Sequence, residues 1–386
     1  MTTTTSHLRA RSGCALLLSL CAASAASGQA SIIELPSLTG SGWNEPTGIS
    51  SDGLVVIGRN GGRAFRWSQA HGMQDWGALP NLSTLYWPLA VSDDGAVAAG
   101  EWQTLSPSGK AIRWTRHGGA QDLGFIDESG QDPNARARDL TGDGQLVVGY
   151  TTDGGFAWDP VRGMRIIPGF SPRFINRPGT MMVGPGAGVT VARWSEGAGV
   201  EPVGGAASYS AAGISDDGTV IIANAIDGSG AARWTQETGF VPIPPPEGRF
   251  GVTAGAVSPD ATVVVGTVND SRPWIWHDGL LNADLKFLLL ELGVDISAWA
   301  SFGGATGVSA DGAVIVGSGS KVGSEFDRTG WLVRLRPTCG SADFDHDGDV
   351  GTDLDIERFF ACLAGNCCDT CYTCDFNGDG QSAQDT

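Results

Sequence analysis

The residues with the clearest chemical potential lie near the C-terminus, where aspartates alternate along a short segment. Asp343, Asp345 and Asp347 stand at every second position, and Gly348 directly follows the third. Carboxylate oxygens in this spacing can surround one Ca²⁺, and a glycine at the sixth position permits the sharp turn that such a loop needs. With Asp349 added, four aspartates within seven residues repel one another unless a cation lies between them. The segment is therefore predicted to bind calcium.

The twelfth position of this loop differs from the usual calcium loop, because Leu354 stands where a carboxylate is expected. The neighbouring carboxylate of Asp353 or Asp355 is expected to serve as the ligand instead. After the loop, apolar residues of the segment 356–363 recur at the spacing of one helical face, and Gly365 follows as a stop signal. The sequence thus predicts a calcium loop followed by an amphipathic helix.

A second copy of the loop begins thirty-two residues after the first. Its candidate ligands are Asp375, Asn377, Asp379, Gln381 and Asp385. Paired calcium loops with helices of this kind resemble a dockerin domain, and the resemblance covers residues 339–386. It implies Ca²⁺ as the bound ion and a cohesin-like protein as the partner. The sequence ends at Thr386 before a second helix, so we expect a small, incomplete dockerin-like tail.

Composition sets this tail apart from the rest of the chain. Residues 339–386 hold eleven acidic residues against one base, Arg358. Six of the eight cysteines also lie there, namely Cys339, Cys362, Cys367, Cys368, Cys371 and Cys374. Such a cluster suits either a zinc site or disulfides; an oxidising compartment favours disulfides, whose pairing the sequence does not choose. The two shifts in composition predict a domain boundary near Pro337 and a Cys-rich tail at 337–386.

The N-terminal residues 1–30 have the pattern of an export signal. Basic residues precede an apolar run, 14–23, and small residues follow it. Cleavage is expected after Ala30, with Ala25 as an alternative, and a lipoprotein signal at Cys21 is a third interpretation. The apolar run is too short to span a bilayer, and no later segment is long enough either. We therefore expect a secreted protein, extracellular or held at the cell surface or in the periplasm, without a membrane span.

Between these ends, residues 31–336 repeat one unit every 36 to 51 residues. Each copy has a segment of small residues, a tight Asp-Gly turn, a β-branched run ending near Gly, and a short strand ending in Trp. The Asp-Gly turns begin at Asp52, Asp94, Asp143, Asp217 and Asp311. Asp260-Ala261 is a weaker copy and Pro178-Gly179 serves the fourth, so we count seven copies. Self-similarity with this period is typical of propeller blades.

Each copy supplies about four strand-like pieces, which in the second copy are 74–79, 85–91, 97–100 and 111–114. Serines directly before the turns are expected to hydrogen-bond to the local backbone. One tryptophan at the same strand position of each copy is most simply packed in the core between blades. These residues are Trp67, Trp114, Trp158, Trp194, Trp234 and Trp276, while in the seventh copy Trp331 takes the position of Phe65.

The two ends of the repeat array are predicted to meet. Residues 32–38 resemble 73–79, which we interpret as the first strand of the following blade. The seventh copy lacks such a strand after Leu335, so the N-terminal strand is expected to complete the last blade. An open array would leave unpaired strand edges that invite aggregation. The prediction is an all-β, closed seven-bladed β-propeller rather than an open solenoid.

One insertion, 280–294, interrupts the β pattern. Leucines recur there at helical spacing from Leu281 onward, with Asn282 as a plausible cap and Gly293 as a stop signal. We expect a short amphipathic helix whose leucines pack on the propeller.

The repeat unit resembles the HAF repeat of bacterial extracellular proteins. The closest copy joins the segment 48–53 (GISSDG) to the segment 64–67 (AFRW). The resemblance covers residues 31–336 and implies an extracellular location and a repeat fold. Arg63 stands where the family carries the histidine of its name, and the resemblance implies no chemistry.

Net charge and motifs limit the classes of function that the chain could have. The net charge of −18 disfavours nucleic acid, which needs lysine and arginine gathered on one face. We find no Gly-x-Ser-x-Gly, His-Glu-x-x-His or P-loop motif. An aspartate that recurs in the turn of each copy is more simply explained by turn formation than by catalysis. The sequence favours a non-enzymatic binding or scaffold protein, whose partner is a cell-surface protein or a polysaccharide. A propeller glycoside hydrolase is the alternative, because dockerin-like tails often accompany enzymes that degrade polysaccharides.

Overall fold

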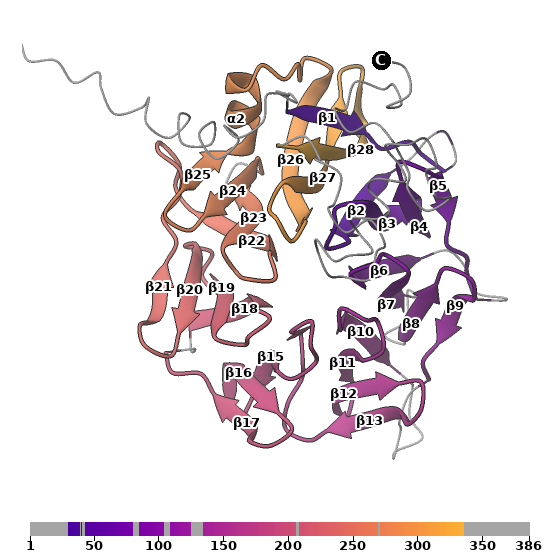
Figure 1. The fold of residues 1–386 in the computed structure, drawn as a ribbon, viewed down its shortest axis with the longest axis vertical. Helices are drawn as coiled ribbons and strands as arrows, with labels where there is room; N and C mark the ends of the chain where they lie inside the picture. The colour runs from indigo at the N-terminus through magenta and orange to yellow at the C-terminus, as the bar shows by residue number, and fades with distance from the viewer. Residues whose placement is uncertain are drawn as a thin grey trace, which may run out of the picture. The chain divides into compact units, whose positions relative to one another are not determined.

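Seven four-stranded sheets are arranged in a ring in the computed structural model of the chain (Figure 1). The structure describes residues 30–38, 40, 43–79, 85–103, 109–124, 134–205, 208–268 and 271–335. One compact unit, Ile32–Val333, contains the ring. The predicted all-β fold with seven propeller blades is therefore confirmed.

The strands follow the order of the sequence from blade to blade. Blade 1 consists of β2 (Asn44–Ile49), β3 (Val55–Asn60), β4 (Arg63–Ser68) and β5 (Gly72–Asp75). Blade 2 consists of β6 (Tyr86–Val91), β7 (Val97–Gln103), β8 (Gly109–Thr115) and β9 (Gly119–Asp122). Blade 3 consists of β10 (Ala135–Leu140), β11 (Val147–Thr151), β12 (Gly154–Asp159) and β13 (Gly163–Ile167).

The second half of the ring repeats this arrangement. Blade 4 consists of β14 (Phe174–Ile175), β15 (Met182–Gly186), β16 (Val189–Ser195) and β17 (Gly199–Pro202). Blade 5 consists of β18 (Tyr209–Ile214), β19 (Val220–Ala225), β20 (Ala231–Thr235) and β21 (Gly239–Pro242). Blade 6 consists of β22 (Val252–Val257), β23 (Val263–Val268), β24 (Pro273–His277) and β25 (Leu281–Asp284). Blade 7 consists of β26 (Trp299–Val308), β27 (Val314–Lys321), β28 (Ser324–Arg334) and β1 (Ser31–Glu34).

The closure of the ring depends on the N-terminal strand. β1 is the outermost strand of blade 7, beside β28, although the two strands lie at opposite ends of the repeat array. Directly after β1, Leu35 is 1% exposed and its N–H donates to the carbonyl of Gly330 over 2.9 Å. The prediction that the N-terminal strand completes the last blade is confirmed.

The phase of the strands within a blade differs from our expectation. The strand expected at 74–79 to open the following blade is β5, and it ends blade 1 instead. Its pairs with β4 include Trp67 with Met73 and Phe65 with Asp75. A three-residue turn after Ser68 folds the chain straight back on β4, so the strand pairs locally, and 76–79 becomes part of the linker to blade 2. Each sequence copy thus spans the outer strand of one blade and three strands of the next.

The Asp-Gly turns are held by a repeated side-chain arrangement. The hydroxyl of Ser50 donates to the carboxylate of Asp52 over 2.5 Å and accepts the N–H of Val55 over 2.9 Å. Gly53 has a φ of 73°, and a Cβ there would approach Val314 to 2.7 Å, so glycine is required. Equivalent serines with the same bonds are Ser92, Ser215, Ser258 and Ser309. The expected serine bonds are confirmed.

Blades 3 and 4 vary this turn. Thr141 replaces the serine in blade 3 and donates to Asp143 over 2.5 Å. In blade 4, Asn176 accepts the N–H groups of Thr180 and Met181, each over 2.9 Å. Gly179 has a φ of 76°, which confirms the turn predicted at Pro178-Gly179.

The repeated tryptophans form the core between blades, as predicted. Trp114 is fully buried, and it packs with Tyr86 of its own blade and with Ile57 of blade 1. Trp67, Trp158, Trp234 and Trp276 are buried as well, whereas Trp194 is half-buried. In blade 7 the position of Phe65 is taken by the fully buried Trp331.

The insertion after blade 6 forms a shorter helix than expected. Leu281 and Asn282 lie in β25, and the helix α2 spans Leu285–Glu291 with Asp284, not Asn282, as its N-cap. The carboxylate of Asp284 accepts the N–H of Lys286 over 3.0 Å, while the amide of Asn282 is engaged by Trp274 and Pro244. The helix buries Leu285, Leu288 and Leu289, so the expected packing of the leucines is confirmed for these three.

Across the described ranges, no helix combines the length and the apolar character needed to cross a bilayer.

Candidate functional site

The residues predicted to bind calcium all lie outside the part of the chain that the structure describes. They are Asp343, Asp345, Asp347, Asp349, Asp353, Asp355, Asp375, Asn377, Asp379, Gln381 and Asp385. Residues 1–29 of the predicted export signal (1–30) and the tail cysteines lie outside it as well. Among the described residues, no group of three or more His, Cys, Asp or Glu side chains is placed to hold a metal ion. The propeller offers two other polar regions, at its central channel and between blades 4 and 5.

The first region is a ring of turn residues around one mouth of the channel that the inner strands enclose. The residue between the turn serine and the turn aspartate contributes to this ring in every blade. We call these residues the turn ring: Ser51, Asp93, Gly142, Arg177, Asp216, Pro259 and Ala310. Backbone hydrogen bonds of 2.7–3.0 Å join neighbours in it, including Asp93 to Gly142, Gly142 to Arg177, and Ala310 to Ser51. The ring therefore ties blades together at the mouth.

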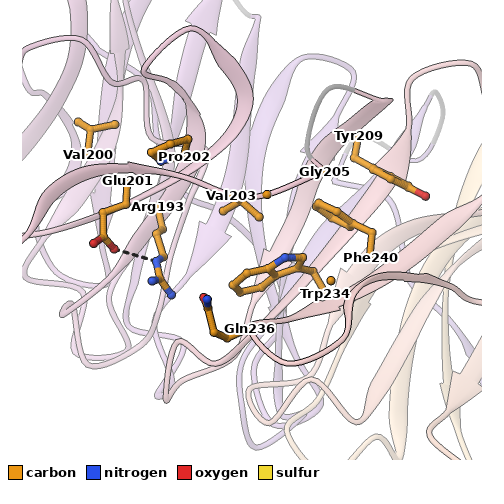
Figure 2. Close-up of a pocket in the computed structure, with 12 residues that line it drawn as sticks. Arg193, Val200, Glu201, Pro202, Val203, Gly205, Tyr209, Trp234, Gln236 and Phe240 are labelled. Atoms are coloured by element: carbon orange, nitrogen blue, oxygen red, sulfur yellow. Dashed lines mark hydrogen bonds and ion pairs between the residues drawn. The ribbon is translucent and has the colours of Figure 1, made fainter.

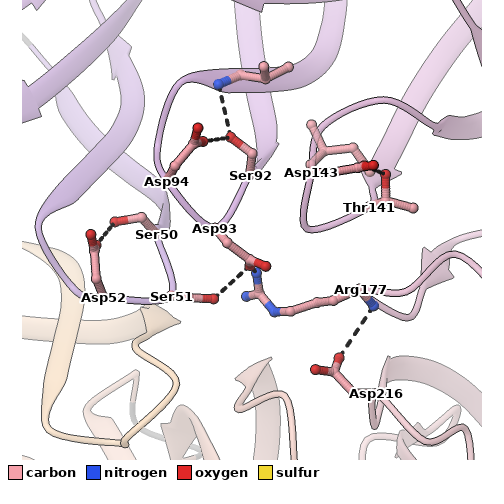
Figure 3. A network of polar contacts seen from close by, with 12 residues as sticks. Ser50, Ser51, Asp52, Ser92, Asp93, Asp94, Thr141, Asp143, Arg177 and Asp216 are labelled. Carbon is pink, nitrogen blue, oxygen red and sulfur yellow. Dashed lines mark hydrogen bonds and ion pairs between the residues drawn. The ribbon is translucent and has the colours of Figure 1, made fainter. Parts of the chain in front are cut away.

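Arg177 is the centre of the side-chain contacts in the turn ring (Figure 3). Its guanidinium forms an ion pair with Asp93, which also accepts the hydroxyl of Ser51 over 2.7 Å. The backbone N–H of Arg177 donates to the carboxylate of Asp216 over 3.3 Å. A Cβ on Gly142 would lie 2.2 Å from the Asp93 carboxylate, so glycine in blade 3 leaves room for a pair between blades 2 and 4. The network therefore links blades 1, 2, 4 and 5.

Partial burial at the mouth shifts the pKa values of two groups in this network. Burial lowers the pKa of the Arg177 guanidinium, and the charge of Asp216 opposes that shift. Burial raises the pKa of the Asp216 carboxyl, and the N–H of Arg177 opposes that shift. Each of these polar groups has a partner, which is the pattern of a structural network.

Asp139 lies deeper in the channel wall, on β10. Its carboxylate accepts the N–H of Leu140 over 2.8 Å and the N–H of Ile175 over 2.9 Å, so it joins blade 3 to blade 4. Burial raises the pKa of Asp139 to about 7, and the two N–H groups and Arg138 oppose that shift. Asp139 directly follows a β-bulge in the first strand of its blade. Five other blades have the same bulge, and the residue that follows it there is small: Gly48, Ala90, Gly213, Ala256 and Gly307.

The second region is a groove of about 810 Å³ between blades 4 and 5 (Figure 2). Blade 4 contributes Arg193 on β16 and Glu201 on β17, which are joined by an ion pair of 3.0 Å. Blade 5 contributes Tyr209, Trp234 and Phe240. The lining of the groove therefore combines a charged pair with three aromatic rings.

Two aromatic rings of the groove form a stacked platform. The rings of Tyr209 and Phe240 stack with centroids 4.3 Å apart and planes 13° apart. Trp234 lies beside them at the floor, 5% exposed, with the Arg193 guanidinium 5.9 Å from its ring centroid. Gln236 lies exposed at the rim next to Trp234 (Figure 2). The aromatic faces and the polar groups thus point into the same space.

The junction between blades 1 and 2 has the same tryptophan and tyrosine positions, but both side chains are covered there. There the hydroxyl of Tyr86 accepts the N–H of Leu79 over 2.9 Å, and the indole N–H of Trp114 donates to the carbonyl of Gly77 over 3.3 Å. The donor, Leu79, and the acceptor, Gly77, both lie in the linker segment 76–79, in which Trp76 is buried. Linker atoms therefore cover and satisfy both aromatic side chains at this junction.

Three other polar groups of the groove lack such partners. Within the described ranges, the hydroxyl of Tyr209, the indole N–H of Trp234 and the side-chain amide of Gln236 make no hydrogen bond to the protein. Val203 takes the place of Trp76, because its N–H bonds to the equivalent carbonyl on the neighbouring strand. Trp234 was expected in the core, and the groove was not predicted from the sequence. The signal that could have revealed the groove is the small side chains of the linker 203–208.

Comparison with known proteins assigns this arrangement to no family, since no family model matches the chain and no curated protein sequence matches it significantly.

Proposed function

We propose that this chain is an exported, non-enzymatic binding or scaffold protein, whose propeller holds an extracellular ligand such as a polysaccharide or a cell-surface protein. The observation that carries the proposal is the groove between blades 4 and 5, where aromatic faces meet polar atoms that the protein leaves unpaired. Ligand sites are typically concave and lined by aromatic side chains, with a few polar groups available to the ligand, which is the arrangement of this groove.

The location at the cell exterior rests on two features of the sequence. The segment 1–30 has the order of charges, apolar residues and small residues that an export signal requires. The repeat unit resembles the HAF repeat of bacterial extracellular proteins, which supports the same location.

The C-terminal segment serves, in this proposal, as a calcium-stabilised docking or anchoring tail of dockerin-like type. The alternating Asp343, Asp345 and Asp347 with Gly348 support one calcium site, and the second loop from Asp375 supports another. A cohesin-like protein is the proposed partner of the tail. Calcium would hold the loop by removing the repulsion between its carboxylates and would stabilise the folded tail by mass action.

Calorimetric titration of the full chain with calcium tests the tail. We expect binding in the wild type and loss of the main site in the double variant Asp343→Ala with Asp347→Ala. The propeller should melt at the same temperature in both proteins. A wild type that binds no calcium at millimolar concentration would contradict the calcium site and remove the basis for a dockerin-like role.

A glycoside hydrolase is the alternative function, and one observation favours it. Asp139 lines the channel with a pKa raised to about 7, a value suited to a general acid. Both of its oxygens, however, already accept backbone N–H groups. In the groove, Glu201 is the carboxylate among the lining residues and it is paired with Arg193, whereas glycosidases use two carboxylates that flank the bond.

A glycan-array screen combined with a reducing-sugar assay on the same sample separates these functions. The proposal expects binding of the full chain to glycans or to a surface protein, without release of reducing ends over hours. Release of reducing sugar that disappears in the variant Asp139→Asn would reassign the protein to the hydrolases.

A further inference from the structure

We propose that the groove between blades 4 and 5 is a binding site for a neutral carbohydrate chain, in which a pyranose ring lies on the Tyr209–Phe240 stack. This inference rests on the proposed binding function and specifies its ligand class and its location. Three observations carry it: how the groove is opened, which atoms it presents, and how its charges balance.

The groove lies at a junction whose linker has no aromatic side chain to cover it. The linker 203–208 between blades 4 and 5 reads Val-Gly-Gly-Ala-Ala-Ser and carries no aromatic residue. At the junctions of blade 1 with blade 2 and of blade 3 with blade 4, the linker instead carries a buried aromatic side chain, Trp76 or Phe170. This junction therefore differs from those two at the place where a ligand could enter.

The open junction presents aromatic faces of the kind that accept the apolar side of a sugar ring. Tyr209 and Phe240 are stacked nearly parallel, and each keeps part of its surface exposed. Aromatic rings offer a large apolar face, and tyrosine and tryptophan add a polar tip at the edge. At the covered junction, Tyr86 and Trp114 are fully buried, so the same two positions cannot contact a ligand there.

The polar atoms around the platform include both hydrogen-bond donors and acceptors. The indole of Trp234 donates, while the hydroxyl of Tyr209 and the amide of Gln236 each donate and accept. Sugar hydroxyls also donate and accept, so they can satisfy this mixed set. A proline-rich peptide, the other common ligand of aromatic grooves, presents carbonyl acceptors and lacks N–H donors at its prolines. The mixed set therefore favours a carbohydrate.

The charges of the groove favour a neutral sugar. Arg193 and Glu201 form a pair, so the two charges cancel at the edge of the groove. An acidic sugar would meet the Glu201 carboxylate and a chain whose net charge is −18. Neutral hydroxyl groups can instead bond to either member of the pair.

The test uses the full chain, in calcium-containing buffer, with soluble neutral polysaccharides as probes. Affinity gel electrophoresis with a mixed-linkage β-glucan, a xylan, a galactomannan and amylose measures binding, and polygalacturonate serves as the acidic comparison. We expect retardation by at least one neutral polymer and none by polygalacturonate. Preference for polygalacturonate would overturn the assignment to neutral sugars.

Two substitutions of glycine by tryptophan form a matched pair for this test. A Cβ on Gly204 meets no atom within 4 Å, so Gly204→Trp can fill the groove without disturbing the fold. Gly197 is equally open, lies in the same blade and does not line the groove. We expect Gly204→Trp to weaken binding by about tenfold or more, and Gly197→Trp to leave binding unchanged.

Two changes at Tyr209 separate stacking from hydrogen bonding. Tyr209→Phe keeps the ring and removes the hydroxyl, so it should weaken binding a few-fold, whereas Tyr209→Ala should abolish retardation. Melting curves establish that the variants are folded. If Gly204→Trp and Tyr209→Ala are folded and bind neutral polymers like the wild type, the groove is not the site, although the protein remains a binding protein.

Two further results distinguish this inference from the proposed function. If the wild type ignores every polysaccharide but binds a pool of proline-rich peptides, and Gly204→Trp abolishes that binding, the groove is a peptide site and the carbohydrate assignment is wrong. If the wild type binds neither polysaccharide, peptide nor glycan array, this inference fails and the proposed function is left with a cell-surface protein as its ligand.

Discussion

The turn ring at the channel mouth and the groove between blades 4 and 5 are built from the same repeat, yet they treat polar atoms in opposite ways. In the turn ring, Arg177 pairs with Asp93, which also binds Ser51. In the groove, the described contacts leave the polar atoms of Tyr209 and Trp234 unpaired. The unpaired atoms of the groove are open to solvent, so they can bond to water or to a ligand. The comparison separates a region that holds blades together from one that is available to a ligand.

The largest effect is expected from opening the ring that supports both regions. Deleting residues 31–38 of the exported chain should expose an edge of β28 and leave the pocket of Leu35 empty, because Leu35 is 1% exposed there. We expect aggregation or loss of the cooperative melting transition, measured by light scattering and calorimetry. Glu34→Gln, which removes only an exposed ion pair with Lys321, is the control. A truncated protein that melts like the full chain would contradict the closure by β1.

Replacing the repeated tryptophan at the two junctions tests the comparison directly. Trp114→Ala and Trp234→Ala should each destabilise the propeller by about 3–5 kcal/mol, the range of large-to-small changes at buried aromatic positions. Chemical unfolding measures both. Only Trp234→Ala should also weaken carbohydrate binding under conditions in which the variant is folded, since Trp114 is fully covered. Equal loss of binding in both variants would mean that the two junctions do not differ in function.

The pH dependence of stability tests the channel carboxyl Asp139. Its pKa is raised to about 7 in the folded protein, whereas an unfolded aspartate has a pKa of about 3.9. The folded state therefore holds a proton that the unfolded state has lost between these values, so the contribution of Asp139 to stability falls as pH rises from about 4 to about 7 and is constant above. The fall amounts to about 4 kcal/mol at most.

The measurement is the difference in unfolding free energy between the wild type and Asp139→Asn at a series of pH values. This difference isolates Asp139, because the other carboxyls are common to both proteins. Some of them act in the opposite direction, since the hydroxyl of Ser215 lowers the pKa of Asp217, whereas burial raises the pKa of Asp216. We expect the wild type to lose stability relative to the variant as pH rises. A difference that does not change with pH would mean that Asp139 is ionised throughout.

The smallest effect is expected from breaking the ion pair of the turn ring. Arg177→Leu should cost about 1–2 kcal/mol, since it removes a charged partner of the half-exposed Asp93 and leaves the backbone bonds of the ring in place. Carbohydrate binding should be unchanged. Arg173→Ala, which removes an exposed bond to Ser210, is the control and should cost less. Loss of binding in Arg177→Leu, with the fold intact, would show that the mouth and the groove are not independent.

Much of the propeller was predictable because its signals are local. The Asp-Gly turns, the serines before them and the substitute turn at Pro178-Gly179 are set by hydrogen bonds within a few residues of the chain. The match between 32–38 and 73–79 predicted the closing strand, since similar strands take equivalent places in a repeat. The helix cap was wrong because Asn282 is engaged by Trp274, a partner that no local pattern reveals.

The sequence by itself determined the number of blades, the turns and the position of the core tryptophans, because each of these depends on periodicity and on short-range bonds. It also predicted the calcium-binding tail, which stays a prediction. The tertiary structure alone decided that Gly72–Asp75 ends blade 1, that Arg177 reaches Asp93 across Gly142, and that the junction at Tyr209 is open. Those outcomes depend on which side chains from neighbouring blades meet in space, and contacts of that kind arise only when the ring is closed.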